Sequence, residues 1–197
     1  MKKLLAVAIT ILITHFSLAQ TKSFQLDAAG SKIKWLGEKR IGSSHEGIIN
    51  FQSGSFDFEK GAPVRGEFVV DMTSIVCVDI EDEGKNAYFV GHLKDDDFFG
   101  VDKYPISRIV IESVSPKDNA YLLSGIIEIK GVKEAISFPA KIEMLGDAVK
   151  ASAKLKIDRT KFGIRYGSDS FFDNLGDKAI SNDFKLTIDL LMKAAGS

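Results

Sequence analysis

Histidine, cysteine and acidic side chains are the residues of this sequence best suited to metal binding or catalysis. His45 and His92 offer imidazoles, which are common metal ligands. They lie far apart in the chain, have no cysteine partner and lack His-x-x-x-His spacing, so the pattern favours ordinary strand or loop residues. The acidic run from Asp79 to Gly84 resembles the start of a calcium loop, but Val90 occupies the position that requires a bidentate glutamate. We therefore expect no metal and no cofactor.

A catalytic nucleophile is not indicated either. The sequence has no Gly-x-Ser-x-Gly motif, and the single cysteine, Cys77, has apolar neighbours that are typical of a buried, inert thiol. Ser44 and His45 are adjacent, so on a strand they point to opposite faces and cannot act as a pair. We predict that the protein is not an enzyme. A metal-assisted enzyme that uses His45 or His92 is the catalytic alternative.

The first residues have the features of a secretory signal peptide. Lys2 and Lys3 precede the apolar run Leu4–Ile13, which is followed by the small-x-small sequence Ser17-Leu18-Ala19. This order predicts a signal peptide over residues 1–19, a mature domain over residues 20–197, and a periplasmic or secreted location. The apolar run is shorter than the roughly 20 residues that span a bilayer. No later segment is long and apolar enough either, so we expect no stable membrane span.

The charge balance argues against nucleic acid as a partner. The whole chain has 26 basic and 27 acidic residues, and removal of Lys2 and Lys3 with the signal peptide leaves 24 against 27, a net charge of −3. Nucleic-acid binding depends on clustered lysine and arginine. With a single cysteine, no disulfide forms within the chain, so the core must supply the stability.

Alternation of apolar and polar residues dominates the mature chain. From Val149 to Ile157 every odd position is apolar and every even position is polar, as in a strand with one buried face. Residues 184–190 repeat this pattern. Further strands are expected near residues 32–37, 45–51, 54–59, 64–72, 106–114, 120–130 and 138–144.

Turn residues separate these strands and define the fold class. Glycine, asparagine, aspartate and proline predict turns at 53–54, 60–63, 116–119, 130–131 and 146–147. Tight connections indicate an antiparallel meander, and closure into a barrel removes the exposed sheet edges. We predict an all-β fold, an antiparallel β-barrel of about eight strands with one or two short helices in the long irregular segments 80–104 and 159–181. A sandwich is the competing architecture.

Several segments, in order along the chain, resemble the YceI-like family. The most recognisable is His92-Leu93-Lys94-Asp95-Asp96-Asp97-Phe98-Phe99 with Lys103-Tyr104-Pro105. The resemblance implies a lipocalin-like, elongated barrel that is exported in bacteria and encloses polyisoprenoid-type lipids or other amphiphiles in an apolar tunnel. The other matching segments are 35–39 with 42–47, 129–132 with 138–139, 157–164 and 171–177.

Aromatic and small residues are the candidates for contact with such a lipid. Trp35, Phe98 and Phe99, with the small inward faces of Ala151 and Ala153, would suit a long hydrocarbon chain. Phe171 and Phe172 either plug one end of the barrel or line its entrance.

The sequence leaves open which residue contacts the polar head of the lipid and whether the protein forms an oligomer. Arg159 or Arg165 could meet a polar head, whereas the structural alternative is an Asp158–Arg159 ion pair that holds the following loop. A homodimer is compatible with the sequence. The alternative function is a structural or stress-related interaction protein with a filled barrel.

Overall fold

The computed structural model describes residues 21–195, so the predicted signal peptide lies outside the described residues. Within them, long strands alternate with tight turns and one α-helix is present. No helix in this range is long and apolar enough to cross a bilayer. The elements are β1 Thr21–Leu26, β2 Lys32–Lys39, β3 Ser44–Glu59, β4 Ala62–Cys77, α1 Glu83–Lys94, β5 Ile106–Lys117, β6 Ala120–Ile129, β7 Val132–Leu145, β8 Ala148–Asp158, the 3₁₀ helices η1 Arg159–Phe162 and η2 Gly176–Lys178, and β9 Ile180–Ala194.

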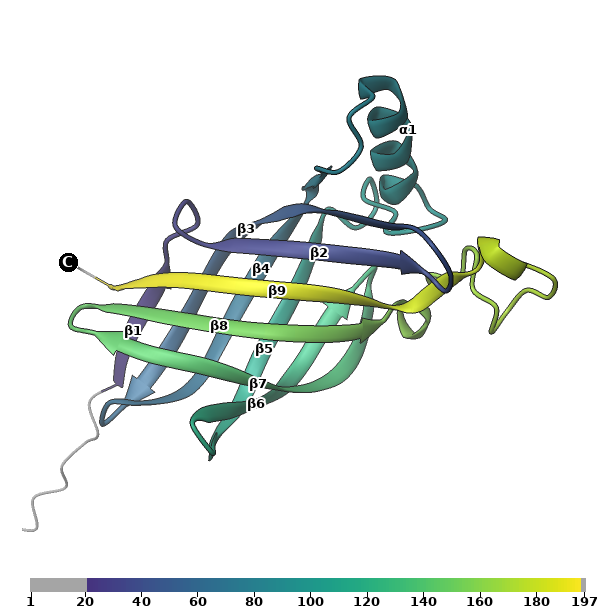
Figure 1. The fold of residues 1–197 in the computed structure, drawn as a ribbon. Coiled ribbons are helices and arrows are strands. Elements are labelled where there is room, and N and C mark those ends of the chain that lie inside the picture. Colours follow the sequence, from purple (N-terminus) through teal and green to yellow (C-terminus); the bar gives the residue numbers. More distant parts are fainter. Residues whose placement is uncertain (1–20, 196–197) are drawn as a thin grey trace, which may run out of the picture.

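The strands form a closed antiparallel barrel with eight strand positions (Figure 1). Neighbouring strands pair in the order β3-β2-β9-β8-β7-β6-β5-β4, and β4 pairs again with β3 to close the ring. The short β1 shares a position with β2: it pairs with residues 55–59 of β3 and 192–194 of β9, beyond the residues that β2 contacts. The all-β, lipocalin-like barrel of about eight strands that the sequence predicts is therefore confirmed.

Most of the predicted turns are present, and two are tight glycine hairpins. Lys60 and Gly61 have φ angles of 53° and 82°, and Lys130 and Gly131 have 52° and 73°. Positive φ at both central residues is the geometry of two-residue hairpins that suits twisted strands. The second position is glycine in both turns because glycine adopts this conformation without steric cost.

The turn predicted at Ser53-Gly54 is wrong, because β3 runs through it without a break. The pairing of β3 with β4 shifts register between Phe51 and Ser53, so a bulge absorbs an extra residue. Gly54 serves packing instead of a turn, since a Cβ atom there would lie 2.3 Å from Cδ1 of Phe68.

The two irregular segments contain the helices that the sequence predicts there, and they lie at the same end of the barrel (Figure 1). α1 is capped by Asp82, the residue before its first turn, whose carboxylate accepts a hydrogen bond from the backbone N–H of Lys85. The second segment connects β8 to β9 through η1 and η2. We call this end, with α1 and residues 159–179, the helix end.

The opposite half of the barrel is filled by phenylalanine side chains. The rings of Phe24 and Phe58 lie 5.1 Å apart, and those of Phe56 and Phe68 lie 6.1 Å apart. All four side chains are at most 5% exposed. This packing closes the barrel on one side, so any large internal space must lie towards the helix end.

Candidate functional site: an apolar cavity at the helix end

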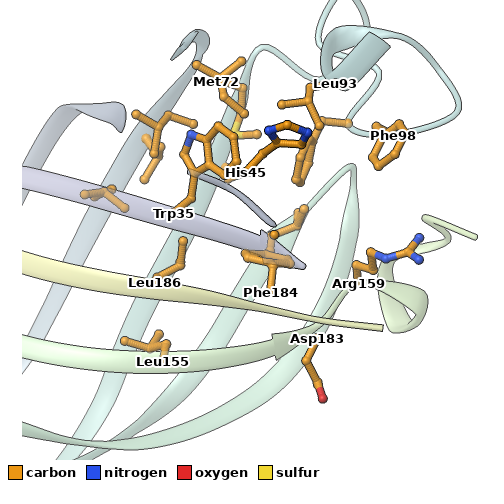
Figure 2. A pocket seen from close by; sticks show the side chains of 18 of the residues that line it. Trp35, His45, Met72, Leu93, Phe98, Leu155, Arg159, Asp183, Phe184 and Leu186 are labelled. Carbon is orange, nitrogen blue, oxygen red and sulfur yellow. The ribbon is translucent and has the colours of Figure 1, made fainter. Parts of the chain in front are cut away.

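A cavity of about 400 Å³ occupies the helix end of the barrel (Figure 2). Its wall consists mainly of inward-facing aliphatic and aromatic side chains from at least five strands. A cavity of roughly 150 Å³ lined by apolar side chains already holds benzene, so this space suits a larger apolar molecule. The apolar wall residues are Ile33, Trp35, Ile49, Phe51, Val70, Met72, Ile75, Phe89, Leu93, Phe98, Phe99, Ile109, Ile127, Ile129, Leu155, Ile180, Phe184, Leu186 and Ile188.

α1 and the turn that follows it cover the cavity from the helix end. Leu93 is the one buried residue of α1 and, with Phe89, lines the cavity. Phe98 and Phe99 come from the turn after the helix, and the Phe99 ring meets that of Phe184 edge-on at 6.2 Å. The segment between β4 and β5 therefore supplies a cover whose apolar side chains face the barrel interior.

Trp35 forms one side of the cavity and depends on a glycine in the neighbouring strand. The indole nitrogen donates a hydrogen bond to the carbonyl oxygen of Val76, at 3.2 Å. The ring lies against Gly47, where a Cβ atom would be 2.4 Å from Cζ2 of Trp35. Gly47 therefore leaves the space that the indole needs.

Ser107 is a polar exception in the apolar wall. It precedes Ile109 and Ile111 on the inward face of β5, is 9% exposed, and lines the cavity. Its hydroxyl is the one buried side-chain polar atom of the described residues that has no hydrogen-bond partner. Burial of a hydroxyl without a partner is unfavourable by about 1–3 kcal/mol, so a polar atom of a bound molecule would stabilise this position.

Arg159 lies in the cavity wall, but the chain itself satisfies most of its guanidinium. Nε donates to Ser181 O at 2.9 Å, Nη1 to Ile164 O at 3.0 Å and Tyr166 O at 2.8 Å, and Nη2 to Ile180 O at 3.1 Å. Burial lowers the pKa of Arg159, and the nearby Asp158 opposes this shift. Arg159 therefore holds the segment between β8 and β9.

The ion pair expected between Asp158 and Arg159 is not what holds this segment. The Asp158 carboxylate instead accepts from the backbone N–H of Thr160 at 2.9 Å and from its hydroxyl at 2.6 Å, which caps η1. The two side chains anchor the segment separately, one through a helix cap and the other through backbone carbonyls.

The structure divides the other predicted contact residues into two groups. Ala151 and Ala153 line a separate cavity of about 50 Å³, which shares Phe51, Ile109 and Ile188 with the wall of the large one. Phe171 and Phe172 lie outside both cavity walls and are 46% and 51% exposed. The guanidinium of Arg165 lies 4.7 Å from the Phe171 ring centre. Trp35, Phe98, Phe99 and Arg159 therefore line the large cavity, and the two alanines line the small cavity next to it, on the side of the filled half.

Sequence reasoning missed the contribution of α1 and of Ser107. The helix carries no apolar stripe, and only one of its residues is buried, so periodicity gives no sign that it covers a cavity. Ser107 follows the predicted start of a strand, where alternation could have placed it on the inward face with Ile109 and Ile111.

Both histidines line the cavity, but among the described residues no cluster of potential metal ligands contains the two together. His45 lies at the cavity wall, where its Nδ1 is 3.0 Å from Oδ2 of Asp79 and its ring is 4.6 Å from that of Phe89. His92 packs edge-on against Phe98, with ring centres 4.9 Å apart. Cys77 is buried, as expected from its neighbours.

A closed antiparallel barrel with a large apolar cavity under a helical cover defines a lipocalin-like protein. A family model described as a YceI-like domain matches residues 24–192. The chain belongs to the YceI-like family. A comparison with curated proteins finds no match.

Solved structures of similar proteins have the same fold at low sequence identity. BcnA of Burkholderia cenocepacia is 20% identical, with 84% of this chain and 98% of that chain covered and a TM-score of 0.68. A polyisoprenoid binding domain from Saccharophagus degradans, implicated in plant cell wall breakdown, is 15% identical, with coverage of 87% and 98% and a TM-score of 0.64. The YceI protein of Campylobacter jejuni is 17% identical over 100% of both chains, with a TM-score of 0.53.

Proposed function

We propose that the protein is a periplasmic or secreted carrier that encloses an isoprenoid-like or fatty amphiphile and performs no chemistry on it. The observation that carries this proposal is the apolar cavity of about 400 Å³ at the helix end. Removal of hydrocarbon from water is favourable by about 2.5 kcal/mol per 100 Å². A chain of moderate length could therefore bind tightly after the ordering costs are subtracted.

A filled barrel, the alternative interpretation of the sequence, fits the structure less well. Phenylalanine side chains fill one half, but the residues that face inwards at the helix end leave the cavity between them. A purely structural protein has no use for such a space, because empty volume lowers stability.

Ser107 supports a ligand with both apolar and polar parts. Its hydroxyl, without a partner in the chain, can exchange a hydrogen bond with an alcohol, carbonyl or carboxylate. A pure hydrocarbon would leave this group unsatisfied. We therefore favour an amphiphile over a hydrocarbon.

The signal-peptide features of residues 1–19 and the polyisoprenoid binding domain among the structural neighbours support export and a lipid ligand. A carrier of this type shields a poorly soluble molecule from water in an aqueous compartment.

Binding can be followed with the single tryptophan, because Trp35 lines the cavity. We expect farnesol to change the Trp35 fluorescence in a saturable manner. Val70→Phe places a ring in the cavity wall and should weaken binding by at least about tenfold, a loss of about 1.4 kcal/mol.

The matched control is Val69→Phe, which makes the same substitution at the adjacent position of β4. Val69 lines neither cavity and, as the neighbour of an inward-facing residue, points to the outer face. Equal effects of the two substitutions, or no saturable response of the unmodified protein to farnesol, would contradict binding in this cavity.

A further inference from the structure

A thiol, an imidazole and a carboxylate meet at the rim of the barrel, beside the apolar cavity. His45 is near the start of β3, Cys77 is the last residue of β4, and Asp79 follows two positions later. One potential ligand atom from each residue lies within 4.8 Å of the other two. We refer to His45, Cys77 and Asp79 as the rim triad. Of the three, His45 also lines the cavity, but metal binding at the rim triad does not depend on the carrier function proposed above.

The backbone holds the rim triad in place. β3 and β4 pair here, with Gly47 opposite Cys77, and the N–H of Val78 donates to Glu46 O at 3.0 Å. The Asn86 side chain of α1 donates to the carbonyl oxygens of Cys77 at 3.1 Å and Ile80 at 2.9 Å. The chain thus fixes the positions of the three residues from both sides, which is the preorganisation that a metal site requires.

We propose that the rim triad binds a divalent, borderline-soft cation such as Zn²⁺, with His45 Nδ1, Cys77 Sγ and an Asp79 oxygen as ligands. Nitrogen, sulfur and carboxylate oxygen are the ligand atoms that zinc uses, and three protein ligands leave a fourth position for water or another molecule. Harder cations such as Mg²⁺ and Ca²⁺ prefer oxygen alone.

The distances between the ligand atoms are compatible with such an ion. Asp79 Oδ2 is 3.0 Å from His45 Nδ1, and Asp79 Oδ1 is 2.9 Å from Cys77 Sγ. Bond lengths of about 2.0–2.3 Å at tetrahedral angles separate the ligand atoms by roughly 3.3–3.8 Å. Asp79 approaches each of its two partners through a different oxygen, and each of these contacts would have to lengthen by about half an ångström. His45 Nδ1 and Cys77 Sγ lie within 4.8 Å of one another, so small rotations about the χ angles can bring the three ligand atoms to these separations.

Metal binding replaces two hydrogen bonds by metal–ligand bonds. The Cys77 thiol, which donates to Asp79, loses its proton to solvent as the metal–sulfur bond forms. The Nδ1 proton that His45 donates to the Asp79 carboxylate is released to solvent as well, and the imidazole binds through the freed Nδ1 lone pair as the neutral tautomer with its proton on Nε2. The His45 and Asp79 side chains are 38% and 30% exposed, so an ion can reach the site from solvent.

The experiment uses the purified protein, reduced and free of metal, titrated with Co²⁺ and then Zn²⁺. We expect one Co²⁺ per chain, a sulfur-to-cobalt charge-transfer absorption in the near ultraviolet, and loss of that absorption when Zn²⁺ displaces Co²⁺. Cys77→Ser keeps a hydrogen-bond donor to Asp79 and should abolish the absorption. His45→Gln and Asp79→Asn should weaken Co²⁺ binding by at least about tenfold.

The matched control is His92→Gln. His92 Nε2 lies 3.7 Å from Asp97 Oδ2, which forms a second histidine–carboxylate pair without a thiol. Its substitution should leave the Co²⁺ affinity and the absorption unchanged. Thermal unfolding of each variant establishes that it is folded. Absence of the charge-transfer absorption in the unmodified protein, or unchanged Co²⁺ affinity in folded His45→Gln and Asp79→Asn, would overturn the proposal.

Discussion

Substitution of Arg159 tests whether this residue anchors the segment between β8 and β9 or binds a ligand head group. The side chain is 4% exposed and donates four hydrogen bonds to backbone carbonyls of Ile164, Tyr166, Ile180 and Ser181. Arg159→Met retains the apolar length of the side chain and removes every donor. The four carbonyls then lose their shared partner.

The expected loss of stability follows from these contacts. A hydrogen bond to a charged group contributes about 1.5–3 kcal/mol, but burial of the guanidinium offsets a large part of the total. Arg159→Met leaves four carbonyl oxygens without this donor, and a buried polar group without a partner is unfavourable by about 1–3 kcal/mol. Three of these hydrogen bonds are only partly buried, so water can replace some of them, and we expect the free energy of unfolding to fall by about 3–5 kcal/mol in total. Arg159→Lys should lower the free energy of unfolding by less, about 2 kcal/mol. The lysine ammonium retains the positive charge, but it lacks the planar guanidinium geometry that reaches all four carbonyl oxygens.

The assay is urea unfolding followed by the fluorescence of Trp35, with farnesol titration of the same variants. Trp35 lies in the wall of the same cavity and is the only tryptophan of the sequence, so its fluorescence reports both unfolding and farnesol binding. A loss of stability below about 1 kcal/mol, together with a large drop in farnesol affinity, would refute the anchoring role and favour a head-group contact.

Three further substitutions test the cavity wall. Gly47→Ala would place a Cβ atom 1.8 Å from the backbone oxygen of Val76 and 2.4 Å from Cζ2 of Trp35, so β3 and β4 must separate as well as the indole move. We expect the free energy of unfolding to fall by more than about 3 kcal/mol in urea denaturation. Ala153→Leu fills the small cavity of about 50 Å³ and should weaken binding of geranylgeraniol while sparing the shorter farnesol; equal losses for both alcohols would contradict a tail that extends there. Ser107→Ala should reduce the preference for farnesol over the hydrocarbon farnesene, measured by Trp35 quenching, and an unchanged preference would show that the hydroxyl does not contact the ligand.

The sequence predicts the barrel well because the alternation of apolar residues is a local signal with a fixed spatial meaning. The pattern from Val149 to Ile157 places odd residues inwards, and the structure has β8 in that orientation. The exception, residues 53–54, has the composition of a turn, but Gly54 is required there by the ring of Phe68 from the next strand. Only the three-dimensional pairing shows that requirement.

The sequence identifies some of the residues that line the cavity but does not show which distant residues come together. Trp35, Phe98 and Phe99 are large apolar residues in segments where a barrel wall or cover was expected, and they line the cavity. The rim triad could not be predicted, because β3 and β4 bring His45 beside Cys77 across 32 positions of sequence that show no ligand spacing. Phe171 and Phe172 were candidates for ligand contact, but their side chains are exposed to solvent and line neither cavity. A pair of aromatic residues in a loop does not indicate which way the side chains point.

Native mass spectrometry of the protein purified gently from its own cells tests the central claim most directly. The account predicts a bound molecule in the cavity of about 400 Å³, seen as a mass shift, released by organic solvent and identified as an amphiphile with an isoprenoid or acyl chain. Val70→Phe should reduce the bound fraction, and Val69→Phe should not. Protein that is always empty, and that takes up neither farnesol nor a fatty acid when these are added, would contradict the account.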